Sequence, residues 1–303
     1  MKIELHQAYS FHQIGKRDYQ EDSRCPDKDI LSESQRYFLL CDGVGGCEKG
    51  EVASQTVCDA FNKSLKDTDF SVDFTNADFK QILDNAYNAL DAISNDDNRD
   101  MATTLAFICF HGGGITMAHI GDSRIYQIRP SEGIIYRSDD HSMVNAMVHN
   151  GVLTPEQAIN HPQSNVITRY MEAVDSDQNR CTATVMQTVD VRPGDYFFLC
   201  SDGVLHSISD DELVNILMAT DDDLHKINTI SALSHDSEDN NTAFLIHVKD
   251  VEKDLAMIND EDICDDNHAT KKIKVASQNL EEVESVKQSE NSSIWNKIIN
   301  FFK

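Results

Sequence analysis

The sequence has few basic residues for its acidity. Lys and Arg together number 26, against 52 Asp and Glu, so the formal net charge is −26. Nucleic acids and anionic membrane surfaces attract proteins through positive charge. We therefore expect neither as a partner.

Long apolar runs and paired cysteine motifs are also lacking. No run of about 18 apolar residues appears, which argues against a membrane span, and the N-terminal stretch lacks the apolar core of a signal peptide. The eight cysteines show no CxxC or Cys/His spacing, and Cys41, Cys109 and Cys200 lie inside apolar runs. These features predict free thiols in a reducing compartment and a cytoplasmic protein.

The stretch YFLLCDGVGG, residues 37–46, combines a buried strand with an acidic turn. An apolar run that stops at a turn signal is typical of a strand covered on both faces, and here it ends at Asp42. Gly43, Gly45 and Gly46 allow a sharp turn and a close approach to an ion or a phosphate. An ordinary strand and turn would explain the stretch as well, because Asp and Gly are common turn formers.

The combination of an apolar strand and an acidic turn occurs a second time in the chain. YFFLCSDG, residues 196–203, places Asp202 where another apolar run stops. Further carboxylates stand near expected strand ends, at Glu21 and Asp22 in RDYQED and at Asp239 in EDNNT. They converge only if the strands lie side by side. Oxygen ligands of this kind suit Mg²⁺ or Mn²⁺ rather than zinc.

Apolar spacing predicts the remaining elements. Helical periodicity is found at residues 50–65, 76–93, 139–151, 210–218 and 223–233, with a short helix beginning near Pro155. Strand patterns are found at residues 3–14 (an edge strand), 103–110, 115–121, 124–130, 182–191 and 242–248. Three histidines lie in or after the helix predicted at 139–151, and they are predicted to be structural or solvated: His141, His149 and His161.

The composition changes after the last predicted strand. Residues 251–290 are polar and acidic and carry almost no aromatics, which predicts a disordered tether. Residues 291–303 include IWNKIINFFK, whose apolar residues share one helical face. We expect this helix to dock on its own domain, on a partner protein or on a membrane. The organisation predicted is therefore a domain at 1–250, a tether and a short amphipathic helix.

Seven motifs in order carry a family resemblance. RDYQED, DGVGG, ATTL, GDSR, DHSMVN with NHPQSNVITR, SDG and DNNT resemble the metal-dependent protein serine/threonine phosphatases, type 2C or PPM, in their bacterial form. The resemblance covers roughly residues 5–248. It implies an α+β fold, a four-layer α-β-β-α sandwich of two mostly antiparallel sheets flanked by helices. It also implies a monomer that acts on phosphorylated proteins, the substrates of a cognate Ser/Thr kinase.

The resemblance assigns metal ligands. Asp42 would bridge two tightly bound Mn²⁺ or Mg²⁺ ions, and Gly43 would give its carbonyl oxygen to one of them. Asp202 and Asp239 would hold the other. Asp122 in GDSR matches the aspartate of a third, weaker metal.

It also assigns residues around the reacting phosphate. Glu21 and Asp22 match the acidic pair that orients metal-bound water, and Arg17 matches the arginine that binds the substrate phosphate. Physically, a guanidinium suits two phosphate oxygens at once. A surface ion pair is the simpler explanation of Arg17 beside these carboxylates.

Two positions depart from the family pattern. Val44 stands where animal members often carry a histidine thought to protonate the leaving alkoxide, so water or another group must do so. His206 stands where an acidic residue is common, so it either replaces a carboxylate ligand of the third metal or leaves that site weak. The alternative function is a catalytically inactive phosphoprotein-binding protein. Asp42, Asp202 and Asp239 are all present, which favours the enzyme.

Overall fold

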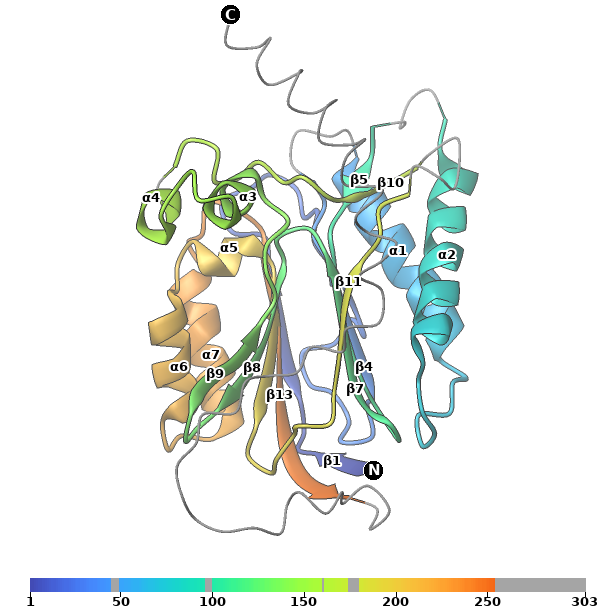
Figure 1. The fold of residues 1–303 in the computed structure, drawn as a ribbon, viewed down its shortest axis with the longest axis vertical. Helices are drawn as coiled ribbons and strands as arrows, with labels where there is room; N and C mark the ends of the chain where they lie inside the picture. Colours follow the sequence, from blue (N-terminus) through green and yellow to red (C-terminus); the bar gives the residue numbers. More distant parts are fainter. Residues whose placement is uncertain (45–48, 96–99, 160, 174–179, 254–303) are drawn as a thin grey trace, which may run out of the picture. The chain divides into compact units, whose positions relative to one another are not determined.

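Two antiparallel sheets pack face to face, and a pair of helices covers the outer face of each (Figure 1). The computed structural model describes residues 1–44, 49–95, 100–159, 161–173 and 180–253. Three apolar layers, one between the sheets and one beneath each helix pair, hold these elements together. The predicted α-β-β-α sandwich is confirmed.

The first sheet contains the N-terminal and C-terminal strands of the described domain. Its order is β1 (Lys2–Leu5), β13 (Asn241–Glu252), β12 (Tyr196–Cys200), β8 (Arg124–Arg129) and β9 (Gly133–Arg137), with β2 (Tyr9–Gln13) also paired to β13. Helices α6 (Asp210–Met218) and α7 (Asp223–Ser234) cover it, and the one-turn helix α5 (Asp202–Leu205) follows β12.

The second sheet is built from the middle of the chain. Its order is β11 (Thr184–Thr188), β7 (Gly114–Ile120), β6 (Leu105–His111), β4 (Tyr37–Cys41) and β3 (Ser23–Cys25). Helices α1 (Gly50–Leu65) and α2 (Asn76–Ile93) cover it. Strands β5 (Ala102–Thr103) and β10 (Met171–Glu172) pair with each other, and α3 (Met143–His149) and α4 (Pro155–Ile159) precede β10.

Strand β4 shows why its sequence is apolar throughout. Phe38 and Leu40 point into the layer between the sheets, whereas Leu39 and Cys41 face the helices. Successive side chains of a strand point to opposite faces, and here both faces are covered. The ring of Phe38 meets that of Phe244, from the facing sheet, at 5.6 Å and a steep angle.

Two predicted strands are interrupted. Residues 3–14 form two strands, β1 and β2, because the long strand β13 offers one edge on which both can pair. The run 103–110 is broken at Thr104. Its N–H still bonds to the Asp42 carbonyl, but the Asp42 N–H bonds to the Thr104 hydroxyl in place of its carbonyl. Helix α3 is shorter than predicted and begins after Ser142, whose hydroxyl caps it.

Several predictions lie at or beyond the limits of the described chain. Strand β13 continues to Glu252, paired with Lys2. The tether and the C-terminal helix, apart from the first residues after 250, lie outside the described residues, as do Gly45 and Gly46. The six cysteines within the described ranges are free thiols. None of the helices there combines the length and apolar character that crossing a bilayer requires.

Candidate active site

Five aspartates lie around one edge of the two sheets, the edge where α5 and β5 are drawn in Figure 1. Asp42 follows β4 and Asp122 follows β7, and both strands run antiparallel to β6, so they end at the same side. Asp202 follows β12, Asp239 precedes β13 and Asp22 precedes β3. The topology thus brings together residues that are up to 217 positions apart in the chain.

Asp42 occupies the centre of this group. Its pKa is raised well above the ordinary value by burial and then by the charges of Asp22, Asp202, Asp122 and Asp239. Without a cation, such a group of carboxylates cannot all be ionised cheaply.

The pKa values of two neighbouring aspartates are raised for the same reasons. Burial, with the charges of Asp239 and Asp22, raises the pKa of Asp202 to about 7. Burial, with the charges of Asp202 and Asp140, raises the pKa of Asp122 to about 7. Each carboxylate is therefore an electrostatic cost to the others at neutral pH.

Asp22 is fixed by neutral donors. Its Oδ2 accepts hydrogen bonds from the hydroxyls of Ser201, at 2.9 Å, and Thr242, at 2.6 Å. Its Oδ1 is buried and has no hydrogen-bond partner in the described structure. Burial raises the pKa of Asp22 to about 6. A buried oxygen without a partner next to crowded carboxylates fits a divalent cation.

The backbone around Asp42 is held from two sides. The Asp42 N–H donates to the Thr104 hydroxyl at 3.0 Å, and the Thr104 N–H donates back to the Asp42 carbonyl at 2.8 Å. The Gly43 N–H donates to the Glu21 carbonyl at 3.1 Å. A Cβ on Gly43 would lie 2.6 Å from the backbone of Gly50, so only glycine lets this turn pack against α1.

Thr104 also links Asp42 to the turn that carries Asp122. Its hydroxyl lies 2.8 Å from that of Ser123. On the other side of this turn, the ring Nδ1 of His141 accepts a hydrogen bond from the Gly121 N–H at 3.1 Å. The backbone N–H of His141 donates to the Gly121 carbonyl. Sequence reasoning assigned no role to Thr104. The only signal was its place in the ATTL motif.

Asn240 anchors the loop that carries Arg17. Its side-chain amide donates to the carbonyls of Ile14, at 2.8 Å, and Tyr19, at 2.9 Å, and its Oδ1 accepts from the Glu21 N–H at 2.8 Å. These bonds join residues more than 200 positions apart. Sequence analysis missed Asn240, which showed only as a neighbour of Asp239.

Arg17 lies beside the aspartates. Its Nη2 donates to Asp239 Oδ2 at 2.6 Å, and its side chain is 42% exposed. Burial raises the pKa of Glu21, and the charge of Arg17 opposes this rise. The guanidinium is thus held next to the carboxylates while still open to solvent.

Of the other predicted residues, His206 lies beside one of the five aspartates. His206 Nε2 is 3.9 Å from Asp202 Oδ2, and its side chain is 39% exposed. Val44 carries no polar side-chain group, and its N–H donates to the carbonyl of Ala102. Exposed His149 lies 3.5 Å from Asp139, and His161 Nδ1 accepts from the Gln163 N–H.

The aspartates are neighbours without being gathered on one point. Across the described ranges, no three His, Cys, Asp or Glu side chains are already arranged as a set of metal ligands. The fit to a metal lies in the chemistry of the donors. They are oxygens, their charge is in excess, and one buried oxygen has no partner.

Comparison with known proteins agrees with this chemistry. The family described as protein phosphatase 2C matches residues 14–222. A putative protein phosphatase 2C-type from Streptococcus pyogenes is 33% identical over 181 residues, 59% of this chain and 71% of the relative. The serine/threonine protein phosphatase PstP of Mycobacterium tuberculosis is 34% identical over 64% of this chain, a match that spans 36% of PstP.

A solved structure extends the likeness to the fold. It is the catalytic domain of the serine/threonine protein phosphatase PstP in complex with two manganese ions. It superimposes with a TM-score of 0.65 at 28% identity and covers 82% of this chain and all of that one.

The raised pKa values predict how stability depends on pH in the absence of metal. Because folding raises the pKa of Asp202 to about 7, its contribution is fully present below the unfolded value, about 3.9, and is lost as the pH rises through about 7. In chelator, we expect the free energy of unfolding measured with urea to fall from pH 5 to pH 8. The fall should be smaller in Asp202→Asn.

Asp67→Asn is the matched control, because Asp67 is exposed on the loop after α1. It should follow the wild-type pH dependence. An equal fall in Asp202→Asn and the wild type would show that the aspartates do not crowd one another.

Proposed function

The chain belongs to the protein phosphatase 2C family and is by that membership a serine/threonine protein phosphatase, and we propose that it hydrolyses phosphoserine and phosphothreonine monoesters on proteins at a centre of two Mn²⁺ or Mg²⁺ ions. The observation that carries this proposal is the group of crowded aspartates around Asp42. Such a group is stabilised by cations at neutral pH, and bound cations can activate water and neutralise the charge that develops when a phosphate ester is hydrolysed.

Four residues would hold the two ions. Asp42, at the centre of the group, suits a bridging ligand, and the Gly43 carbonyl follows it in the chain. Asp202 and Asp239 would complete the set from the other sheet. When bound, the ions supply activation of water and neutralisation of phosphate charge.

The remaining residues would act on the substrate and on the water. Arg17 would bind two phosphate oxygens through its exposed guanidinium, exchanging its contact with Asp239 for the ligand. Glu21 and Asp22 would orient the attacking water, and Asp22 is held for this by Ser201 and Thr242.

The positions of the site residues also suggest where the phosphatase domain ends. Every residue in this proposal precedes residue 250, so we place the phosphatase domain at 1–250, extended to Glu252 by the end of β13, and infer that the predicted tether and C-terminal helix are not needed for the reaction. Substrates would be phosphoproteins made by a cognate kinase, bound by a monomer. Val44 cannot protonate the leaving alkoxide, so we assign that proton to water.

The first test is metal-dependent turnover. With Mn²⁺, the purified chain should release phosphate from a phosphothreonine peptide, and chelation should abolish release. Asp42→Asn and Asp202→Asn should each lower kcat by ~100-fold or more, because each removes charge that holds the ions.

Asp67→Asn should leave kcat unchanged, and thermal unfolding should show that all variants are folded. Activity that persists under exhaustive chelation would refute the metal mechanism. Tight phosphopeptide binding without turnover would instead support the inactive, phosphoprotein-binding alternative.

The second test concerns Arg17. Arg17→Ala should raise KM about tenfold with a smaller change in kcat, because the lost contact is already made in the bound substrate. Lys16→Ala removes an adjacent, exposed cation paired with Glu238 and should change neither constant. An effect of Arg17→Ala confined to kcat would show that the contact forms only in the transition state.

The third test concerns the weaker metal. Asp122→Ala should change the Mn²⁺ concentration needed for activity, while calorimetry still shows two tight sites. His206→Asp should lower the Mn²⁺ concentration for half-maximal activity, because a carboxylate near Asp202 adds charge that the imidazole lacks. Loss of a tight site in Asp122→Ala would move Asp122 into the main pair.

A further inference from the structure

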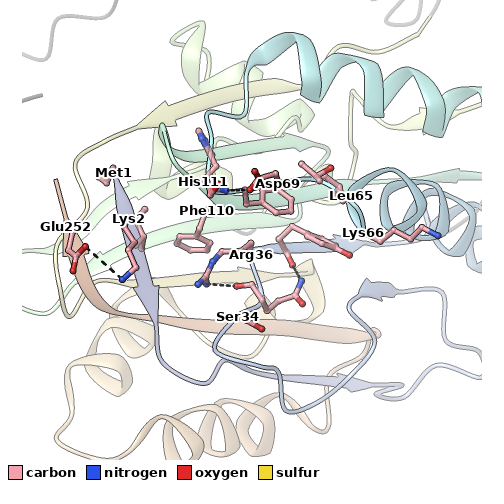
Figure 2. Close-up of a pocket in the computed structure, with 16 residues that line it drawn as sticks. Met1, Lys2, Ser34, Arg36, Leu65, Lys66, Asp69, Phe110, His111 and Glu252 are labelled. Carbon is pink, nitrogen blue, oxygen red and sulfur yellow. Dashed lines mark hydrogen bonds and ion pairs between the residues drawn. The ribbon is translucent and has the colours of Figure 1, made fainter. Parts of the chain in front are cut away.

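A hollow of about 850 Å³ lies at the opposite end of β4 and β6 from the aspartates (Figure 2). Tyr37, at the start of β4, lines it, whereas Asp42 follows the end of that strand. Five residues at ~3.3 Å each separate the two ends by roughly 17 Å. The volume is in the range of small-molecule sites in proteins. None of the residues proposed to act on phosphate lines it.

Arg36, in the middle of the hollow, has no carboxylate within 4.0 Å in the described chain (Figure 2). Its Nη1 donates to the carbonyls of Glu33 and Gln35, both at 3.0 Å, and its Nε and Nη2 have no hydrogen-bond partner in the described chain. Burial lowers the pKa of Arg36 in spite of the charge of Glu4. A half-buried cation with unused donors is stabilised when an anion binds.

Most other described arginines do have a carboxylate partner. Among the described residues, only Arg36 and the exposed Arg169 have no carboxylate within 4.0 Å. The acidic chain, with a formal net charge of −26, offers carboxylates almost everywhere else. The Nε and Nη2 of Arg36 are therefore open to an anionic ligand.

Two lysines that line the hollow also bear on its preference for an anion. Lys66 lines it and has no carboxylate within 4.0 Å in the described chain. Lys2 lines it as well, bound to Glu4 at 2.6 Å and 4.0 Å from Glu252. The two lining carboxylates are Asp69 and Glu252, and neither lies within 4.0 Å of Arg36 or Lys66.

An aromatic wall stands beside the cations. The rings of Tyr37 and Phe70 are 5.8 Å apart and both are partly exposed. The Tyr37 hydroxyl donates to Asn62 Oδ1 at 2.8 Å, which fixes that ring. Both rings pack on the apolar layer that contains Leu65, and buried Phe110 also lines the hollow from the layer between the sheets. The hollow thus offers a surface for an apolar body next to donors for an acidic group.

We infer that this hollow binds a small organic anion, one acidic group carried on an aromatic or aliphatic body. The acidic group pairs with the Nε and Nη2 of Arg36, with Lys66 as a second positive charge. The apolar body packs on Tyr37 and Phe70. The inference does not depend on phosphatase activity.

The test uses 8-anilinonaphthalene-1-sulfonate, an aromatic sulfonate that fluoresces in apolar sites. Titration of the folded, full-length chain in chelator keeps metals away from the aspartates. We expect one equivalent to bind, and we expect Arg36→Gln to weaken binding about tenfold or more, with partial recovery in Arg36→Lys. Arg192→Gln removes an exposed arginine outside the hollow and should leave the affinity unchanged.

Two further measurements keep the inference testable if Arg36→Gln unfolds, which its urea midpoint would reveal. Phe70→Ala should also weaken binding, and benzenesulfonate should displace the dye where neutral benzyl alcohol at the same concentration does not. The inference is overturned if the wild type does not bind the dye, if a folded Arg36→Gln binds it as tightly, or if benzyl alcohol competes equally well.

Discussion

The repulsion among buried carboxylates is the constraint on which this structure depends. Asp42 is surrounded by four other aspartates, and burial raises the cost of each charge. The chain bears this cost because three apolar layers, beneath each helix pair and between the sheets, stabilise the framework. The strands deliver the carboxylates to one edge of the two sheets. Oxygen ligands with excess negative charge are the kind that a divalent ion prefers.

The groups that position the carboxylates leave their charge available. Hydroxyls of Ser201 and Thr242 hold Asp22, the hydroxyl of Thr104 holds the Asp42 backbone, and the amide of Asn240 holds the loop of Glu21. These donors are neutral. A lysine or arginine in their place would neutralise the site and compete with a metal. Arg17 is the exception, and we propose that its partly exposed contact with Asp239 is exchanged for a phosphate.

The two ends of the sandwich carry side chains of opposite charge. Carboxylates gather where β4 and β7 end, while Arg36 and Lys66 stand at the far end of β4 and of helix α1. Because charges that face solvent are screened over about 8–10 Å, two such sites separated by the length of a strand can prefer ions of opposite sign.

The sequence by itself determined the elements whose signals are local. Apolar periodicity placed α1, α2 and α6 with the bounds the structure shows, because alternation between core and solvent repeats every turn of a helix. It also identified Asp42 and Asp202 as strand-end residues, while their roles came from the family resemblance. Only the tertiary structure decided the break at Thr104, the division of residues 3–14 into two strands, and the bonds of Asn240. It alone assembled the hollow around Arg36. These features join residues far apart in the chain, and no pattern among sequence neighbours encodes which distant backbone or side chain will supply the partner.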